Sequence, residues 1–136
     1  MKTRTLLALL TIVFSPSLIA NIPKDDASTY VVASIAGTCS GELNKQGKTN
    51  DAIYMGQIAA SLISPYSEKL QSDSSYLYST TRFSGSVSKQ VSTLNDLSNV
   101  CSQLTSALRT RDNKKIESII DHVIQTADIE RILLKL

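Results

Sequence analysis

The stretch that decides the fold is LNDLSNVCSQLTSAL, residues 94–108. Within it, apolar side chains follow one another at intervals of three and four residues, at Leu94, Leu97, Cys101, Leu104 and Leu108. Such spacing places side chains on one face of an α-helix. Val87 and Val91 continue the face backwards. The pattern therefore predicts an amphipathic helix that carries Cys101 on its buried side.

A second apolar stripe carries the other cysteine. Residues 27–43 have apolar side chains at helical spacing, and Cys39 lies on or beside this stripe. Two cysteines in an exported chain most economically form one disulfide, here Cys39–Cys101. The alternative is a pair of buried free thiols. A disulfide requires the helix of residues 27–43 to pack against the helix around Cys101.

Two more helices are expected in the middle of the chain. Residues 44–50 are polar and contain Gly47, which is typical of a loop. Asn50 or Asp51 then caps a helix with a broad apolar face, which ends at Ser64-Pro65. The same Ser-Pro pair starts a third helix, because proline suits the first helical position.

The segment of residues 72–86 is rich in serine and threonine. These side chains compete with the helical backbone for hydrogen bonds, so we predict that the third helix gives way here to an extended connection. An alternative is a short hairpin through Tyr76–Phe83, although no tight-turn dipeptide separates its halves.

The C-terminal part predicts one further helix and its continuation. A turn at residues 110–112 leads into a stretch with apolar residues at helical spacing from Ile116 to Ala127, and Thr126 or Asp128 restarts the helix. The pattern as a whole predicts an all-α fold, a compact bundle of about four to six helices stapled by one disulfide.

The first residues predict an export signal. Lys2 and Arg4 precede an apolar run, residues 6–14, and a small-residue stretch that ends at Ala20. The run is shorter than the roughly 20 residues that span a bilayer. We expect cleavage after Ala20, which leaves residues 21–136 as one helical domain in the periplasm, with no membrane insertion of the mature chain.

Charge and residue usage narrow the function classes. The chain has 14 basic and 12 acidic residues, and loss of Lys2 and Arg4 would leave it near neutral, so we expect no nucleic-acid partner. The single histidine, His122, follows Asp121, and neighbours on a helix do not face each other. No nucleophile elbow, phosphate loop or zinc-protease motif occurs. We predict that the protein is not an enzyme and uses no metal or cofactor.

Binding to another protein is the function that remains. Tyr76, Tyr78, Arg82 and Phe83 stand together in an otherwise small and polar segment, and tyrosine and arginine are enriched in interface hot spots. The alternative is that the aromatic side chains cover the core from a loop. The C-terminal residues 129–136 could likewise form either a dimer contact or a last core helix.

The chain resembles the small periplasmic immunity proteins that protect bacteria from amidase effectors of type VI secretion. The resemblance covers most of the mature chain and rests on an order of features, namely Tyr30–Cys39, DAIY at 51–54, SPYSE at 64–68, Cys101 and DNKKIESII at 112–120. It implies a non-enzymatic and often homodimeric protein. Its partner would be a papain-like peptidoglycan amidase, whose Cys–His cleft is blocked by a connecting loop. Other readings are a holdase chaperone like those of acid stress, or an envelope-assembly accessory protein.

Overall fold

The computed structural model describes residues 22–136, so the predicted export signal, residues 1–20, lies outside the described part. The elements are α1 (Lys24–Lys45), α2 (Thr49–Ile63), the 3-10 turn η2 (Ser64–Tyr66), α3 (Ser67–Ser72), α4 (Ser74–Val91), α5 (Leu97–Thr110), α6 (Asn113–Thr126) and α7 (Ile129–Leu133). No strand occurs among these residues. The predicted all-α bundle with one disulfide is confirmed.

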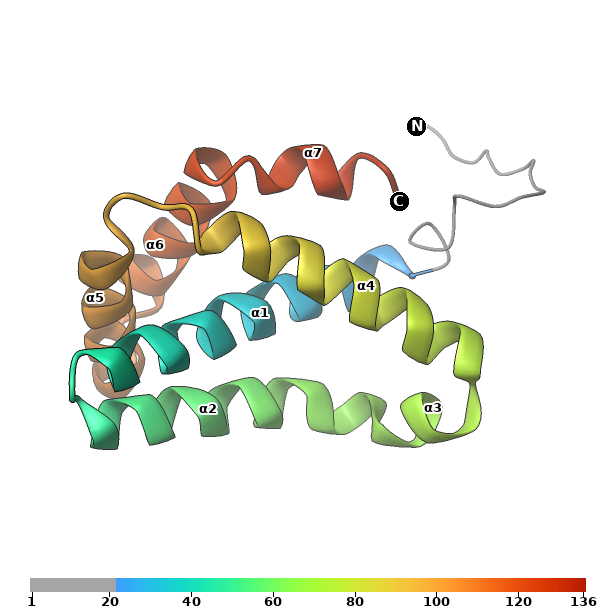
Figure 1. Cartoon of the computed structure of the whole chain (residues 1–136), viewed down its shortest axis with the longest axis horizontal. Coiled ribbons are helices and arrows are strands. Elements are labelled where there is room, and N and C mark those ends of the chain that lie inside the picture. Colours follow the sequence, from blue (N-terminus) through green and yellow to red (C-terminus); the bar gives the residue numbers. More distant parts are fainter. Residues whose placement is uncertain (1–21) are drawn as a thin grey trace.

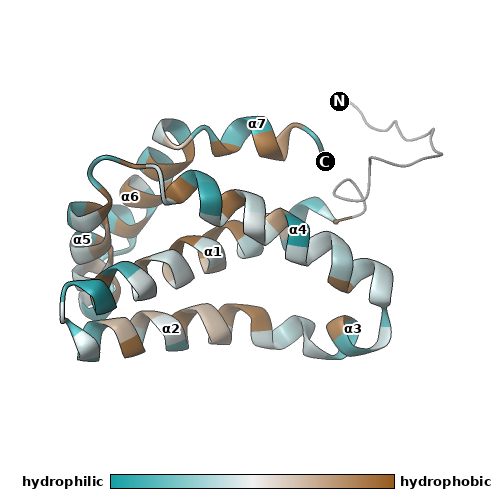
Figure 2. Ribbon diagram, viewed as in Figure 1, coloured by the Kyte–Doolittle hydropathy of each residue, from teal (hydrophilic) through white to brown (hydrophobic). Residues whose placement is uncertain are grey.

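Helix α1 is the centre of the bundle. It packs against α2 on one side, α4 on another and α5 near its C-terminal end (Figure 1). α6 lies behind α5, and α7 runs beside α4. Hydrophobic residues follow most of α2, whereas the visible side of α4 is largely hydrophilic (Figure 2). The central position of α1 explains why its apolar stripe is fully buried, with Ile35, Cys39 and Leu43 shielded from solvent.

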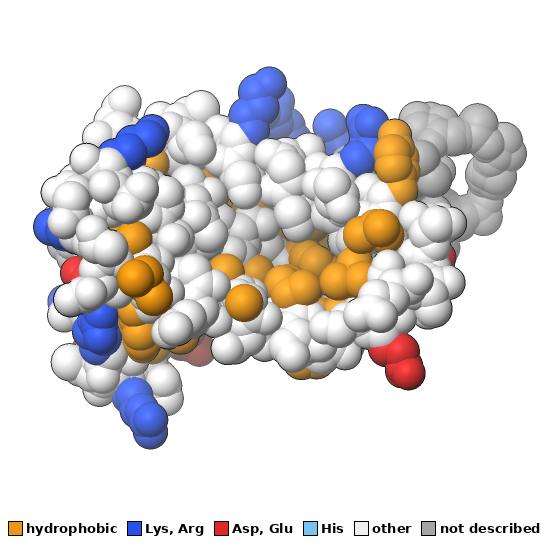
Figure 3. Space-filling model, turned by 60° about the horizontal axis from the view of Figure 1, so that its bottom comes forward, with side chains coloured by type: hydrophobic (Ala, Val, Ile, Leu, Met, Phe, Trp, Pro, Cys, Tyr) orange, Lys and Arg blue, Asp and Glu red, His pale blue; other side chains and the backbone are white. Residues whose placement is uncertain are grey.

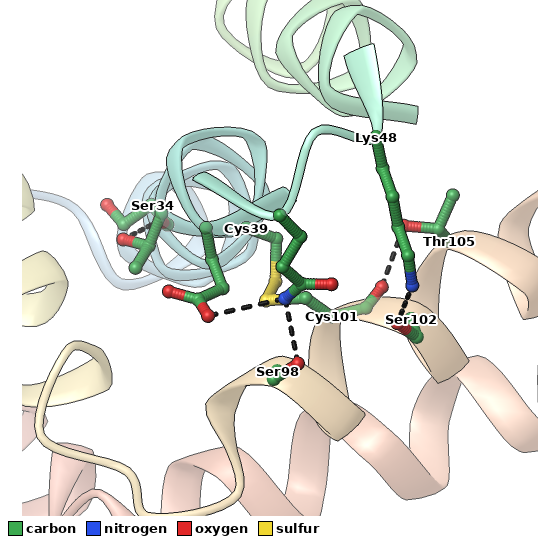
Figure 4. The surroundings of a disulfide bond; sticks show 10 residues. Ser34, Cys39, Lys48, Ser98, Cys101, Ser102 and Thr105 are labelled. Carbon is green, nitrogen blue, oxygen red and sulfur yellow. Dashed lines mark hydrogen bonds between the residues drawn. A yellow bond between two sulfur atoms is a disulfide. The ribbon is translucent and has the colours of Figure 1, made fainter. Parts of the chain in front are cut away.

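The disulfide joins the two helices that the sequence pattern brought together. Cys39 of α1 and Cys101 of α5 are bonded, their Cα atoms are 5.1 Å apart, and both side chains are completely buried (Figure 4). The alternative of two free thiols is therefore wrong. Because the bond links segments 62 residues apart, it fixes the position of the C-terminal helices on α1.

The prediction of an extended connection at residues 72–86 is wrong, because this segment forms most of α4. Asp73 caps the helix by accepting a hydrogen bond from the Tyr76 backbone N–H at 3.0 Å. The Thr80 hydroxyl donates to the Tyr76 carbonyl at 2.9 Å, within the helix. Packing of Phe83 and Val87 in the core outweighs the weak helix propensity of serine and threonine.

The predicted continuation of the Cys101 helix back to Val87 is also wrong. The chain turns at residues 92–96, so Val87 belongs to α4 and Cys101 to α5. The Thr93 hydroxyl donates to the Gln90 carbonyl at 2.6 Å and helps to end α4. Leu94 is still buried, although it lies in the turn. The apolar spacing therefore identified core residues correctly but joined two helices into one.

The helix ends agree in part with the sequence. α2 begins at Thr49 and has no side-chain cap, so neither Asn50 nor Asp51 caps it as predicted. Asp51 instead pairs with Arg109 of α5 at 2.9 Å. The restart near Asp128 is confirmed, since Asp128 precedes α7 with a left-handed φ of 59°. No helix of residues 22–136 is both long and apolar enough to cross a membrane.

Candidate functional site

Helix α4 divides the four predicted binding residues between two faces. Tyr78 and Arg82 are exposed and lie one helical turn apart. The Arg82 guanidinium donates a hydrogen bond to the Tyr78 hydroxyl at 3.0 Å, and it lies 5.5 Å from the centre of the Tyr78 ring. Tyr78 is 47 % exposed, and the neighbouring Leu77 is 46 % exposed. We call Leu77, Tyr78 and Arg82 the α4 patch.

Tyr76 and Phe83 lie on the opposite face of α4 and belong to the core. Phe83 is completely buried and Tyr76 is only 4 % exposed. The alternative that aromatic side chains of this segment cover the core therefore holds for these two residues, although they do so from a helix and not from a loop. Of the four predicted binding residues, only Tyr78 and Arg82 can contact a partner directly, because a partner cannot reach buried side chains.

Tyr76 also joins the N-terminal ends of α1 and α4. Its hydroxyl donates to Asp26 at 2.8 Å, and the Lys69 ammonium lies 4.2 Å from the centre of its ring. Tyr30 and Tyr66 complete an aromatic cluster, with ring centres 5.4 Å apart. This bond depends on the packing of α1 on α4, which brings Asp26 and Tyr76 together from positions 50 residues apart in the sequence.

This environment predicts a loss of stability in alkali. Burial raises the pKa of the Tyr76 hydroxyl well above its usual value, and the bond to Asp26 acts in the same direction. A tyrosine in the unfolded chain ionises near pH 10, whereas the folded protein keeps Tyr76 protonated. Stability from this group is therefore present below about pH 10 and is lost as the pH rises further, at up to about 1.4 kcal/mol per pH unit.

Urea unfolding at pH 9 to 11 will measure this loss, with ring ionisation followed by absorbance. Tyr76→Phe should be less stable at pH 7 by about 1 kcal/mol, because it loses the bond to Asp26. The same variant should show a shallower decline above pH 10. Equal slopes for the two proteins would contradict the argument.

The loop between α1 and α2 is fixed onto α5. The Gln46 amide donates to the Ser98 hydroxyl at 2.8 Å, and the Lys48 ammonium donates to the Ser102 hydroxyl at 3.2 Å (Figure 4). Both bonds lie close to the Cys39–Cys101 disulfide, which joins α1 to α5. Gln46 and Lys48 therefore hold the connection between α1 and α2 against α5.

His122 has a structural partner. Its Nε2 lies 3.1 Å from the Asp96 carboxylate and its Nδ1 lies 3.3 Å from the Thr126 hydroxyl, so the ring links α6 to the turn before α5. The sequence neighbour Asp121 takes no part in these contacts. Among residues 22–136, no three His, Cys, Asp or Glu side chains are grouped closely enough to hold a metal ion.

The structure adds a surface that the sequence did not reveal. Only Ala52 and Met55 of α2 are buried, and the side chain of Ile53 is 55 % exposed, although the helix is strongly apolar. Figure 3 looks towards this side of the molecule and shows hydrophobic side chains gathered in a hollow. Where α1, α2, α5 and α6 meet, a cavity of about 280 Å³ is lined almost entirely by aliphatic side chains.

The described chain is thus an all-α domain with one disulfide, a polar–aromatic patch on α4 and a partly exposed apolar side. Comparisons with protein-family models, characterised proteins and solved structures find no match for this chain.

Proposed function

We propose that the mature domain is a periplasmic immunity protein that binds a type VI secretion peptidoglycan amidase effector and blocks its active site. The observation that carries the proposal is the α4 patch. Tyr78 and Arg82 are exposed, bonded to each other and unnecessary for the core. Exposed tyrosine and arginine side chains in a defined geometry are typical of interface hot spots.

The scaffold beneath the patch supports tight binding. Phe83, Val87 and Val91 anchor α4 in the core, and α1, on which α4 packs, is bonded to α5 through Cys39–Cys101. A helix held in this way presents its outer side chains with little loss of conformational entropy when a partner binds. The patch therefore has the preorganisation that an inhibitor of an enzyme cleft needs, and it offers a helix face where the family resemblance implied a loop.

The proposed compartment rests on two features. A buried disulfide is compatible with an oxidising, extracytoplasmic environment. The sequence pattern of residues 1–20 is that of an export signal. The periplasm is also the compartment in which an inhibitor of a peptidoglycan amidase would have to act.

The test is inhibition of candidate amidase effectors in a peptidoglycan hydrolysis assay. Tyr78→Ala/Arg82→Ala should weaken binding by about 100-fold, since loss of a hot-spot pair costs roughly 2–4 kcal/mol. Ser75→Ala/Lys89→Ala, a change of two other exposed α4 residues, is the matched control and should bind like the wild type. Both variants should keep the helical circular dichroism signal. Unchanged inhibition by the Tyr78→Ala/Arg82→Ala variant would exclude the α4 patch as the interface.

A holdase chaperone is the second candidate, and the partly exposed α2 favours it. Exposed apolar surface such as Ile53 could hold unfolded chains. An assay of aggregation with a denatured client protein at neutral and acid pH separates the two functions. The chaperone function would replace the immunity proposal if the protein suppressed aggregation of several unrelated clients and inhibited no amidase. If it did neither, an envelope-assembly accessory role would remain.

A further inference from the structure

The cavity between α2 and α6 is open to solvent and almost free of polar groups. Its walls include Ile58 and Leu62 of α2, Leu104 and Leu108 of α5, and Ile116 and Ile120 of α6. Except for Leu104, these side chains are only half-buried. Ser61 supplies the only side-chain hydroxyl of the lining. Apolar surface of this kind is stabilised when it is covered by another apolar group.

Two acidic side chains of α6 lie on the solvent side of the isoleucines that line the cavity. Glu117 and Asp121 are exposed and lie one turn apart. Glu117 is three residues from Ile120, so it neighbours the cavity lining on the helix surface, and Asp121 lies one turn further along the same row. Among the described residues neither carboxylate forms a salt bridge, whereas Arg109 of α5 is already paired with Asp51. Both carboxylates also line a shallow polar hollow on the outer side of α6, whose basic lining residues are Lys114 and His122.

The size and chemistry of the cavity favour a protein segment over a small ligand. Sites for small molecules carry several convergent polar groups that orient the ligand, and this cavity offers one hydroxyl. Its 280 Å³ is about twice the roughly 150 Å³ of an apolar cavity that holds benzene, so it can take one large or two smaller aliphatic side chains. A helix presents such side chains at positions i and i+4.

We infer that the surface made by the cavity and the Glu117–Asp121 row, here called the α2–α6 face, binds a basic amphipathic helix of a partner protein. Apolar side chains of that helix fill the cavity, and its Lys or Arg side chains lie against Glu117 and Asp121. The charge of the row is the argument for a basic partner, because it attracts a cationic flank and repels an acidic one. This surface is separate from the α4 patch and goes beyond the proposed inhibition.

The experiment uses two synthetic helical peptides of about 18 residues with leucine on one face and either lysine or glutamate elsewhere. Fluorescence anisotropy with the whole mature domain at low salt measures binding, and NMR amide shifts locate it. The Leu–Lys peptide should bind about tenfold more tightly than the Leu–Glu peptide, with shifts on α2 and α6. Equal binding of both peptides, or shifts centred elsewhere, would overturn the inference.

Two variants with matched controls make the test specific. Glu117→Lys/Asp121→Lys should reverse the peptide preference, whereas Glu68→Lys/Glu130→Lys, which changes the net charge equally at exposed positions on α3 and α7, should keep it. Ser61→Phe, which fills the cavity mouth, should weaken Leu–Lys binding at least fivefold, whereas Ser75→Phe on α4 should not. If the two charge variants behave alike, the attraction is unspecific and the inference fails. If Ser61→Phe binds like the wild type, the cavity is not the binding site.

Discussion

Replacement of both disulfide cysteines, Cys39→Ala/Cys101→Ala, will lower the free energy of unfolding by about 4 kcal/mol. The bond closes a loop between residues 62 apart in the sequence, and chain-entropy arithmetic for such a loop gives this value. A small domain has only roughly 5–15 kcal/mol in total, so the variant should be marginal at 37 °C. Both sulfurs are completely buried, and alanine leaves no unpaired polar group in their place.

Urea unfolding followed by circular dichroism will measure this change. The wild type, reduced while it is unfolded and then measured in the reduced form, should show the same loss of stability within about 1 kcal/mol. Reduction and the double substitution both remove the bond that closes the loop. Cys39→Ser/Cys101→Ser should be worse than the alanine variant, since it buries two hydroxyls in an apolar environment. A loss below about 1 kcal/mol would mean that residual contacts between the α1 and α5 segments already restrict the unfolded chain. The entropic argument would then fail.

The bond between α1 and α5 was predictable because two independent signals agreed. The spacing from Leu97 to Leu108 placed Cys101 on a buried helix face, and Cys39 lay on or beside the apolar stripe of the first helix. Two cysteines on buried helix faces can be bonded only if those helices pack together. Periodicity alone could not see the turn at residues 92–96, because Leu94 is buried from the turn and keeps the apolar spacing intact.

Helix α4 shows what local sequence cannot supply. Its serines and threonines are weak helix formers, and its stability comes from contacts with α1 and from the Asp73 cap. Once the segment is helical, its four candidate residues separate by spacing alone. Tyr76 and Phe83 are seven residues apart and share the inner face, whereas Tyr78 and Arg82 are four apart and share the outer face.

The α2–α6 face was not predictable from one sequence. Its cavity is assembled from four helices, and apart from Ser61 its lining residues are the aliphatic types found in any core. One feature of the sequence is related to this face: α6 contains more isoleucine and valine residues than the structure buries. Ile119 and Val123 are shielded, whereas Ile116, Ile120 and Ile124 are only half-buried.

The division of α4 into an inner and an outer face gives the second large prediction. Phe83→Ala will lower the free energy of unfolding by about 3–5 kcal/mol, because it removes a completely buried ring and leaves a cavity between α4 and α1. Tyr78→Ala on the outer face of the same helix should cost no more than about 0.5 kcal/mol, as expected for an exposed position. Urea unfolding of both variants at pH 7 measures the difference.

A milder change at Phe83, compared with Tyr78→Ala, separates folding from binding. Phe83→Leu, which keeps most of the apolar volume, should fold with a loss of about 1 kcal/mol and, under the proposed function, should still inhibit the amidase partner like the wild type. Tyr78→Ala should show the reverse, with normal stability and weak inhibition. If Phe83→Leu inhibits poorly while it remains fully folded, the inner face of α4 takes part in binding through a rearrangement of the helix. Equal stability losses for Phe83→Ala and Tyr78→Ala would mean instead that α4 is not anchored by its inner face, and the rigid presentation of Tyr78 and Arg82 would lose its physical basis.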